Sequence, residues 1–301
     1  MDRRSFIKNL PGLVLLSSTS LTYLHAEGLR EMTDNIYLDW TVRLGQTGLS
    51  VPVLAMGTGT IGWNGASNQT RLGMDRFVEL AHHAYDIGVR FFDMAEEYGS
   101  HPFVAEAIKG LPRKELTLQT KIAGTEKLSA SDVDKRIDAF CHDLGTDYID
   151  ILLMHCMMSG DWPSKNQPAM SALEQAKKDG RVRAVGISCH NIDALRTAAE
   201  SPWLDVLLAR LNPFQSHMDG TPDEIREVLS LARRNGKGVI GMKIFGEGKH
   251  VKDEEREQSL RFALTDSPLH AMTIGFESIA QLDDAVSRIM RIKGVSREKK
   301  K

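Results

Sequence analysis

Short apolar segments alternate with amphipathic segments eight times along this chain. The apolar segments carry few polar residues, as expected of strands that are buried on both faces. A regular alternation of such strands with helices is typical of a parallel sheet with helices packed against it. The strands are expected at residues 53–58, 90–94, 116–121, 148–155, 184–188, 206–212, 238–244 and 271–275.

Signals for helix ends agree with this alternation. Residues 76–85 carry apolar side chains at helical spacing, Ser131-Asp132 is expected to cap a helix that runs through Leu144, and Thr221 opens another helix. Glycines follow four of the expected helices, where a left-handed residue often ends a helix: Gly88, Gly145, Gly180 and Gly236. We therefore predict one (β/α)8 TIM barrel, with a short β-hairpin at residues 33–50 before its first strand.

The chain length is compatible with this single domain. Of the 301 residues, 42% are hydrophobic and 26% are charged, which is an ordinary globular composition. Since a barrel of ~250 residues forms one domain, we expect a linker at 27–39, the barrel at 40–295 and a basic tail at 296–301. The net charge of −2 gives no global attraction to nucleic acid or to anionic lipid.

The cysteines and histidines do not suggest a metal centre. Cys141, Cys156 and Cys189 are too few for a disulfide framework and form no Cys-x-x-Cys pair. No cluster of histidines and acidic residues marks the expected strand ends. We therefore expect no metal site.

The first 26 residues have the features of an export signal. Arg3-Arg4 and Lys8 give a basic start, and an apolar stretch follows at residues 10–24. The paired arginines resemble a twin-arginine (Tat) signal. This resemblance predicts the Tat export machinery as a partner and a periplasmic location. The Tat route carries proteins that are already folded, with any cofactor inside. The stretch is too short and too rich in Ser and Thr for stable membrane insertion. If the signal is not functional, residues 1–26 are instead a frayed helix of a cytoplasmic protein.

The string Gly57-Thr58-Gly59-Thr60-Ile61-Gly62 matches the G-x-G-x-x-G pattern of dinucleotide-binding Rossmann folds. That fingerprint must open a helix directly and place an acidic residue ~20 positions further on. Here Trp63-Asn64-Gly65 continues a loop, and Asp93 lies well past that spacing. We interpret the glycines as part of a loop that lies close to the barrel mouth.

Four polar residues stand at or just after three successive strand ends. Asp93 ends the second strand, Tyr98 follows it in a loop, Lys121 ends the third strand and His155 ends the fourth. Polar side chains that close apolar strands are costly unless they are paired. These four can pair with one another at the C-terminal rim of a barrel, where barrel enzymes keep their chemistry. We predict that they form a catalytic site.

These residue types suit the reduction of a carbonyl group. Hydride addition builds negative charge on the carbonyl oxygen, which then needs a proton or strong hydrogen-bond donors. The Tyr98 hydroxyl can supply the proton, and a nearby Lys121 ammonium is expected to lower the pKa of this hydroxyl. Asp93 would hold Lys121 charged, and His155 would donate a hydrogen bond to the oxygen. Alcohol oxidation uses the same groups in the reverse direction.

Beyond these four residues, the sequence resembles the aldo/keto reductase family over almost all of residues 41–290. The segments that carry the resemblance are 43–52, 92–99, 120–121, 154–155 and 180–188. The resemblance implies an oxidoreductase that moves a hydride between bound NAD(P)H and a small aldehyde, ketone, sugar or alcohol. It also implies Tyr98 as the general acid and base, assisted by Asp93, Lys121 and His155.

The cofactor contacts that the resemblance implies match this chain less well. Ser188 matches the family serine near the nicotinamide, but Cys189 follows it in place of an asparagine. On the sixth strand Leu208 replaces a glutamine, and Asn212 is the nearest polar substitute. On the seventh strand Met242 replaces a stacking tyrosine. The remaining expected contacts of the cofactor are Lys243, Gly246, Gly275, Glu277 and Ser278.

Glu277 and Ser278 occupy the place of the family's NADPH-binding arginine or lysine. A carboxylate repels the 2′-phosphate of NADPH, whereas it accepts a hydrogen bond from the free ribose hydroxyl of NADH. The resemblance implies NADP(H), and Glu277 makes NAD(H) compatible with the site. Alternatively, Glu277 only begins the last helix, where an acidic residue suits the helix dipole.

Further alternatives stay open at this point. Trp63, in the loop after the first strand, is expected to wall the substrate pocket, although a position in the core is the alternative. The rival functions are a nucleotide-binding sensor without turnover and a lyase in which Lys121 forms a Schiff base. The presence of all four predicted catalytic residues favours catalysis over sensing.

Overall fold

The computed structural model describes residues 37–298. The expected export signal at residues 1–26, residues 27–36 of the expected linker and residues 299–301 of the expected tail lie outside the described residues. Within residues 37–298, no helix combines the length and the apolar composition needed to cross a membrane.

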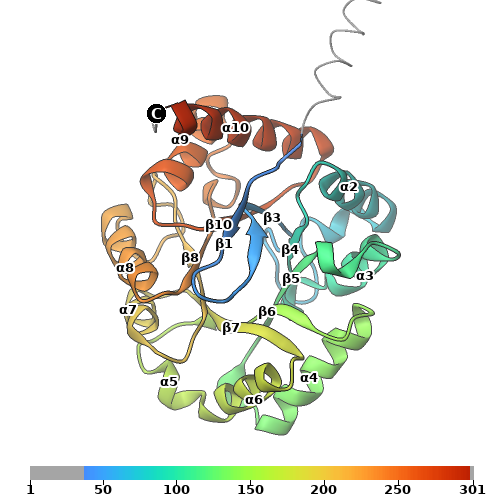
Figure 1. Cartoon of the computed structure of the whole chain (residues 1–301), viewed down its shortest axis with the longest axis vertical. Coiled ribbons are helices and arrows are strands. Elements are labelled where there is room, and N and C mark those ends of the chain that lie inside the picture. The colour runs from blue at the N-terminus through green and yellow to red at the C-terminus, as the bar shows by residue number, and fades with distance from the viewer. Residues whose placement is uncertain (1–36, 299–301) are drawn as a thin grey trace, which may run out of the picture. The chain divides into compact units, whose positions relative to one another are not determined.

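Eight parallel strands close into a barrel in the order β10-β3-β4-β5-β6-β7-β8-β9, and Figure 1 shows the helices arranged around them. This is the (β/α)8 TIM barrel that the alternation predicts. Most strand residues are buried, because the barrel interior covers one face and the helices cover the other. The barrel strands are β3 (Leu54–Gly57), β4 (Phe91–Asp93), β5 (Thr117–Ile122), β6 (Ile149–Met157), β7 (Val182–Cys189), β8 (Val206–Arg210), β9 (Gly238–Met242) and β10 (Ala271–Gly275).

Two strands end earlier than their apolar sequences suggest. β8 ends at Arg210 and β9 ends at Met242, so Asn212 and Lys243 lie in loops. Lys243 has a φ of 59°, a left-handed conformation that does not continue a β-strand. Leu211 and Ile244 are buried although they lie outside the sheet. Burial of these loop residues is the reason why the apolar pattern overestimates both strands.

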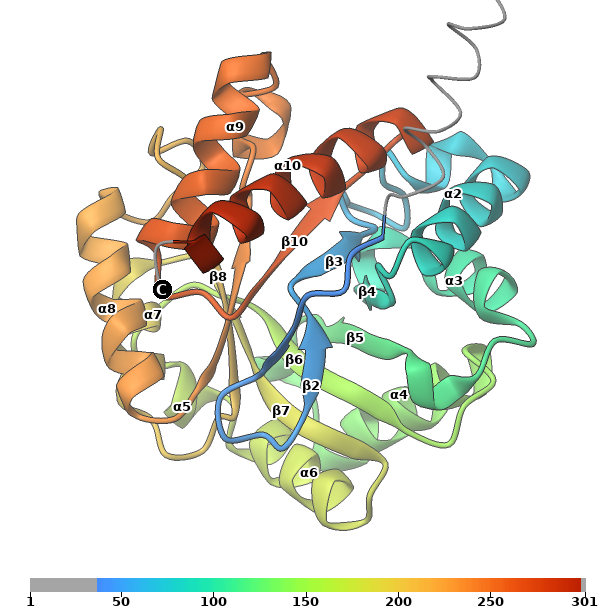
Figure 2. The ribbon, with the colours of Figure 1, turned by 45° about the horizontal axis from the view of Figure 1, so that its top comes forward.

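The helices alternate with the strands as predicted, and Figure 2 shows α10 running between α9 and α2 on the outside of the barrel. The four glycines expected after helices all have positive φ values: Gly88, Gly145, Gly180 and Gly236. The α-helices are α2 (Met74–Asp86), α3 (His101–Ile108), α4 (Ala130–Asp143), α5 (Trp162–Lys165), α6 (Gln167–Lys178), α7 (Ile192–Glu200), α8 (Pro222–Arg234), α9 (Asp253–Arg261) and α10 (Ile279–Glu298). Shorter helical turns are η1 (Thr70–Leu72), η2 (Glu96–Tyr98), η3 (Arg113–Glu115), η4 (Thr125–Lys127), η5 (Gly246–Gly248) and η6 (Phe262–Asp266).

The N-terminal caps of two helices use side chains that reach back to the backbone. Thr221 begins α8 and forms a capping box with Glu224, as the sequence indicates. The cap of α4 is Ser129, which replaces the expected Ser131: the Ser129 side chain accepts from the Asp132 N–H. The sequence offers two serines near this end, and only the backbone direction before the helix decides which of them is the cap.

An antiparallel hairpin closes one end of the barrel. Its strands β1 (Thr41–Arg43) and β2 (Ser50–Pro52) lie slightly later in the chain than the predicted residues 33–50, and Figure 1 shows them across the barrel. The Gln46 N–H donates to the Gly236 carbonyl just before β9, so the hairpin covers the N-terminal end of the strands. Its apolar side chains join the barrel core: Leu44, Leu49 and Val51.

Strand β6 is irregular beside the predicted catalytic histidine. It extends past His155 to Met157, and its register with β7 shifts between Met154 and Met157. Cys156 has a φ of 65°, and its N–H donates to the Ser188 hydroxyl at 2.8 Å. Because a bulge of this kind re-aims the side chain next to it, the irregularity contributes to the direction of His155 at the rim.

Candidate active site

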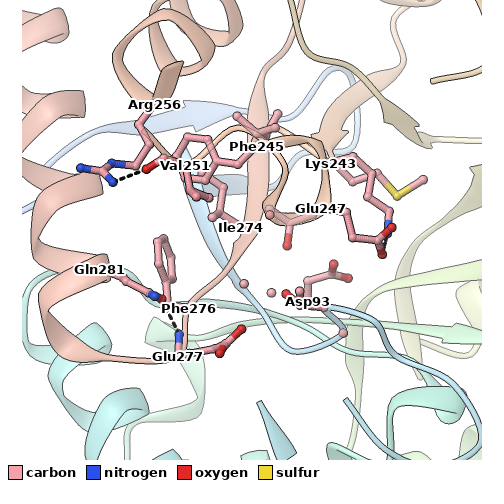
Figure 3. Close-up of a pocket in the computed structure, with 18 of the residues that line it drawn as sticks. Asp93, Lys243, Phe245, Glu247, Val251, Arg256, Ile274, Phe276, Glu277 and Gln281 are labelled. Atoms are coloured by element: carbon pink, nitrogen blue, oxygen red, sulfur yellow. Dashed lines mark hydrogen bonds and ion pairs between the residues drawn. The ribbon is translucent and has the colours of Figure 1, made fainter. Parts of the chain in front are cut away.

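A cavity of about 400 Å³ opens at the C-terminal end of the barrel. Its walls come from the ends of β3, β4, β9 and β10, from the loop after β9, and from α9 and α10. Figure 3 shows Asp93 on one side of this cavity and Arg256 and Gln281 on the other side. The cavity therefore leads from the predicted catalytic residues to the start of α10.

A buried ion pair lies at the catalytic side of the cavity. The Lys121 ammonium on β5 donates to Asp93 Oδ1 on β4 at 2.5 Å and to the Met94 carbonyl at 2.7 Å. Gln119 Nε2 donates to the same Asp93 oxygen at 2.7 Å. Gln119 and Lys121 are two residues apart on one strand, so their side chains point to the same face. Since both charges are removed from water, these hydrogen bonds are needed to keep the pair in place.

Tyr98 lines the cavity from the turn η2 after β4. Lys121 Nζ lies 4.9 Å from the centre of the Tyr98 ring, and the His155 ring lies perpendicular to it at 5.7 Å between ring centres. A Cβ on Gly59 would lie 2.2 Å from Tyr98 Cε2, and a Cβ on Gly62 would lie 2.5 Å from Tyr98 Cδ1. The glycine-rich string thus lets the loop after β3 pack against the phenol, in a barrel that contains no Rossmann helix at this point.

The surroundings of Tyr98 keep its hydroxyl protonated. Burial raises the pKa of the phenol well above its ordinary value, and the carboxylates of Asp93 and Glu97 raise it further. The pKa is therefore raised overall, in contrast to the lowering expected from Lys121, because burial and these carboxylates outweigh the ammonium that lies over the ring. Tyr98 is therefore a neutral phenol at neutral pH.

His155 carries no charge at neutral pH. Burial lowers the pKa of its imidazole to about 2, and Lys121 and His190 add to the shift. Its Nδ1 lies 3.2 Å from Glu97 Oε2. A neutral imidazole offers one N–H donor and one acceptor nitrogen, so His155 can exchange a hydrogen bond with a substrate oxygen without changing its charge.

The far end of the cavity is rich in carboxylates. Glu277 and Asp284 both line it, together with Arg256 of α9. Arg256 Nε lies 2.9 Å from Asp284 Oδ2, and its Nη1 donates to the Val251 carbonyl at 2.5 Å, as Figure 3 shows. Asn68 Nδ2 donates to Glu277 Oε1 at 2.8 Å, which holds that carboxylate at the wall. Asp284 is also paired with Arg288, whose Nε lies 3.0 Å from it, so Glu277 is the carboxylate at this end that no lysine or arginine of residues 37–298 pairs with.

Glu277 and Ser278 directly precede helix α10, which begins at Ile279. The Glu277 N–H donates to Gln281 Oε1 at 2.8 Å, and the Ser278 hydroxyl accepts from the Gln281 N–H at 3.3 Å. Glu277 therefore lies just before the helix and also lines the cavity, and its contact with a cofactor stays a prediction. Ser278 serves the helix end and does not line the cavity.

An ion pair lies within the loop after β9 at the cavity mouth, and His217 of the loop after β8 lies beside it. The Lys243 ammonium pairs with Glu247, and His217 Nδ1 lies 3.5 Å from the other Glu247 oxygen. Although its partial burial acts to raise the pKa of Glu247, the hydrogen bond and charge of Lys243 lower it overall. Lys243 lines the cavity, as expected of a cofactor contact, but its ammonium already has a partner.

Asn212 has an internal role. Its Nδ2 donates to the carbonyls of Ser216 and Lys243, and its Oδ1 accepts from the N–H groups of Phe214 and Ser216. All hydrogen-bonding positions of the amide are thus occupied within the loops after β8 and β9. Asn212 is buried and does not line the cavity, and its hydrogen bonds organise the two loops.

The remaining expected contacts differ in their position. Gly275 lines the cavity, and a Cβ there would lie 2.1 Å from Thr60 Oγ1. Gly246 lies next to cavity residues in η5 without lining the cavity itself. Ser188 is fully buried and accepts from the Cys156 N–H at the β6 irregularity.

Trp63 neither lines this cavity nor lies in the core. Its side chain is 71% exposed, and its backbone pairs with Ala66 in an isolated bridge. The loop after β3 places the Trp63 side chain at the surface. Apolar periodicity gives no information about side-chain direction in a loop.

Three residues of the site were missed by the sequence analysis. Gln119 has a recognisable signal, because it is a polar residue two positions before Lys121 in an apolar strand. Glu97 is marked only by its position next to Tyr98. Arg256 gives no signal, since only the packing of α9 brings it to the cavity.

The described residues contain no cluster suited to a metal ion. No group of three or more His, Cys, Asp or Glu side chains in residues 37–298 has the arrangement of a metal site. Cys141, Cys156 and Cys189 are all free thiols.

Known proteins resemble this chain over most of the barrel. A model of the aldo/keto reductase family matches residues 53–299. Methylglyoxal reductase DkgB of Escherichia coli O157:H7 is 28% identical over 213 residues, which covers 68% of this chain and 71% of that protein. An NADH-specific methylglyoxal reductase of Escherichia coli strain K12 is 26% identical over 219 residues, covering 65% of this chain and 64% of that protein.

The holo structure of the aldo-keto reductase AKR11C1 from Bacillus halodurans has the same fold. Its TM-score is 0.60 at 21% sequence identity, and the alignment covers 83% of this chain and 90% of that chain. The family match spans well over half of the sequence and includes all four predicted catalytic residues. This protein therefore belongs to the aldo/keto reductase family.

Proposed function

We propose that this protein reduces a small aldehyde, ketone or sugar with NAD(P)H, and that Tyr98 is the proton donor. Family membership supports an NAD(P)-dependent oxidoreductase in general. The observation that carries the finer proposal is the position of Tyr98, which lies at the cavity wall beside both the Asp93–Lys121 pair and His155.

In this proposal the carbonyl oxygen lies within reach of the Tyr98 hydroxyl and the His155 ring. Tyr98 donates its proton to the oxygen as negative charge develops there. His155 positions the oxygen through a hydrogen bond. Lys121 stays paired with Asp93, and its charge over the ring stabilises the phenolate that remains after proton transfer. The dinucleotide, when bound, supplies the hydride.

The cavity residues fit a dinucleotide. The cavity extends from Tyr98 to the start of α10, where a helix N-terminus favours anionic groups. Thr273 also lines the cavity, and its hydroxyl is buried without a hydrogen-bond partner in the described part of the chain. A buried polar atom of this kind calls for a partner from a bound ligand. Lys243, Arg256 and Gln281 are the residues that would hold the phosphates and the ribose.

We propose NADH in preference to NADPH. The support is Glu277 at the far end of the cavity, a carboxylate that forms no ion pair within residues 37–298, whereas Asp284 is paired with Arg256 and Arg288. The family resemblance places the adenosine phosphate beside Glu277, and a 2′-phosphate there would meet like charge. The name of the NADH-specific relative shows that a similar protein uses this cofactor.

Fluorescence titration with NADH and NADPH, followed by assays with aldehydes, ketones and sugars, tests the proposal. Methylglyoxal belongs in this panel because two relatives are named for it. We expect tight binding of a reduced cofactor and its oxidation by at least one carbonyl compound. Cofactor binding without any turnover would point to the sensor alternative. If neither reduced cofactor binds, the proposed function is wrong.

Borohydride trapping separates a reductase from a Schiff-base lyase. The Lys121 ammonium is buried and donates to Asp93 and Met94, so we expect no covalent adduct at Lys121 after treatment with substrate and borohydride. Mass spectrometry of peptides that contain Lys121 measures this directly. An adduct there would favour the lyase.

We also propose that residues 1–26 direct export through the Tat machinery, on the evidence of Arg3-Arg4. The wild type is expected in the periplasmic fraction with nucleotide bound, and the Arg3→Lys, Arg4→Lys double variant in the cytoplasm. Fractionation followed by immunoblotting compares the two proteins. A wild type that stays in the cytoplasm removes the export proposal and leaves the reductase proposal intact.

A further inference from the structure

Glu97 is a carboxylate at the proposed catalytic centre that no cationic side chain neutralises. It directly precedes Tyr98 in the chain, and its Oε2 lies 3.2 Å from His155 Nδ1. Across residues 37–298, no lysine or arginine forms an ion pair with Glu97, and the His155 ring beside it is neutral. The Glu97 side chain does not line the cavity itself, but it is 29% exposed and directly precedes Tyr98, which does line it.

The neighbouring carboxylate behaves differently. Glu96 Oε2 accepts from Arg136 Nη1 at 2.8 Å and from the Ala123 N–H at 2.9 Å. Glu96 is therefore compensated by a cation and built into the fold. Two adjacent acidic residues in η2 thus have separate roles, and only Glu97 presents its charge to His155.

The titratable rings and the thiol near Glu97 are uncharged at neutral pH, and the cations that also act on them are each paired with another carboxylate: Lys121, Lys243 and Arg210. Burial lowers the pKa of His155 to about 2 and that of His190 to about 4, and the two rings lie 6.3 Å apart. Burial raises the pKa of the Cys156 thiol, and Glu97 adds to this rise. Tyr98 is a neutral phenol for the same reasons. The negative charge of Glu97 is therefore not balanced by these neighbours.

We infer that Glu97 sets the substrate class, selecting neutral hydroxylated carbonyl compounds and excluding those with a carboxylate or phosphate near the reacting carbonyl. The inference rests on the proposed reductase function. A carbonyl oxygen in reach of Tyr98 and His155 places its neighbouring carbon atoms within reach of Glu97. A hydroxyl group on these carbons donates a charge-assisted hydrogen bond to the carboxylate. An anionic group at the same place meets like charge in a partly desolvated site.

A substrate pair that differs in one anionic group tests the inference. We suggest steady-state kinetics with glyceraldehyde and glyceraldehyde 3-phosphate at saturating cofactor, for the wild type and for Glu97→Gln. The substitution keeps the size of the side chain and one acceptor oxygen while it removes the charge. The wild type should prefer glyceraldehyde, and the ratio of the two kcat/KM values should fall at least about tenfold in the variant. Any effect of the substitution through His155 acts on both substrates and cancels in the ratio.

Two further variants serve as controls. Glu96→Gln removes the adjacent carboxylate that faces Arg136, and its ratio should equal that of the wild type. Glu97→Asp keeps the charge and should also keep most of the preference. The dissociation constant of the reduced cofactor, measured for each variant, verifies that the barrel and cavity are intact.

The outcomes separate this inference from the proposed function. An unchanged ratio in Glu97→Gln, or a wild type that accepts the phosphate as readily as glyceraldehyde, overturns the role of Glu97 and leaves the reductase proposal standing. A wild type that turns over no neutral aldehyde overturns the reductase proposal itself. The inference about the substrate class is then also wrong, because it rests on that proposal.

Discussion

The Lys121 ammonium lies over the Tyr98 ring, 4.9 Å from its centre. At this position the cation interacts with the negative face of the ring, while its hydrogen bonds go to Asp93 and to the Met94 carbonyl. The phenol keeps its proton because burial and nearby carboxylates raise its pKa. The charge of Lys121 becomes most favourable once a phenolate forms. Lys121 is thus placed to stabilise the product of proton transfer.

Replacing Tyr98 by phenylalanine removes only the hydroxyl. The ring still fills the space against Gly59 and Gly62, so the cavity should keep its shape. We expect turnover to fall about 10²–10⁴-fold, the usual contribution of general acid catalysis, with little change in the dissociation constant of the reduced cofactor. Stopped-flow assays and fluorescence titration measure the two quantities. If Tyr98→Phe turns over a good substrate at nearly the wild-type rate, Tyr98 is not the proton donor.

Removing the charge of only one partner of the Asp93–Lys121 pair is expected to destabilise the protein strongly. Lys121 is 1% exposed and Asp93 is 5% exposed, so Asp93→Asn leaves a buried ammonium without its counter-charge. The free energy of unfolding should fall by about 3–5 kcal/mol. The double variant Asp93→Leu, Lys121→Met removes both charges and should recover much of this loss. Urea denaturation compares the three proteins, and equal stability of the single and double variants would contradict the argument.

Gly59 is expected to control the position of the catalytic phenol. A Cβ at this residue would lie 2.2 Å from the Tyr98 ring, so Gly59→Ala must displace the ring or the loop. A displacement of about 1 Å at a catalytic group costs about 100-fold in rate. Gly294→Ala is the matched control, because no heavy atom lies within 4 Å of a Cβ placed there. Equal turnover of the two variants would show that the close contact is not needed.

Acid is expected to destabilise the barrel through His101. Its Nε2 lies 2.8 Å from Thr120 Oγ1, its ring stacks on Phe140, and burial lowers its pKa from 6.5 to about 4. The unfolded chain therefore takes up this proton first as the pH falls, so stability is full above pH 6.5 and declines toward pH 4. Over this window the free energy of unfolding should lose about 3 kcal/mol from His101 alone.

The substitution His101→Gln tests this pH dependence. The variant should lose stability less steeply between pH 6.5 and 4 than the wild type does. His142→Gln is the control, because the His142 side chain is 89% exposed. Urea denaturation at several pH values gives the slopes, and parallel slopes for the wild type and His101→Gln would rule out this origin of acid sensitivity.

Glu277 is expected to discriminate against NADPH. Glu277→Gln keeps an acceptor for Asn68 while it removes one of the two carboxylates at the far end of the cavity. The dissociation constant of NADPH should fall about tenfold, and that of NADH should change little, because only NADPH carries the 2′-phosphate. Glu254→Gln, on the exposed surface of α9, is the control. A strong NADPH preference in the wild type that the substitution leaves unchanged would refute the role of Glu277.

The apolar pattern of the sequence was sufficient to predict the barrel. Strand and helix periodicity are local properties, and parallel strands that alternate with helices bring their C-terminal ends to one rim. Asp93, Lys121 and His155 therefore meet although they are distant in the chain. The same reasoning overestimated β8 and β9, because Leu211 and Ile244 are buried in loops and local periodicity does not distinguish such residues from strand residues.

The sequence by itself determined the fold and the choice of the proposed catalytic side chains, because both depend on residue type and on the spacing of strand ends. Only the tertiary structure decided where those side chains point. It turned Asn212 inward, placed Lys121 over the Tyr98 ring, brought Arg256 to the cavity and left Glu97 beside His155 without a cation. These outcomes depend on a few left-handed backbone angles, such as those of Cys156 and Lys243, and on contacts between segments far apart in the chain. Neither is encoded in a local pattern of residue types.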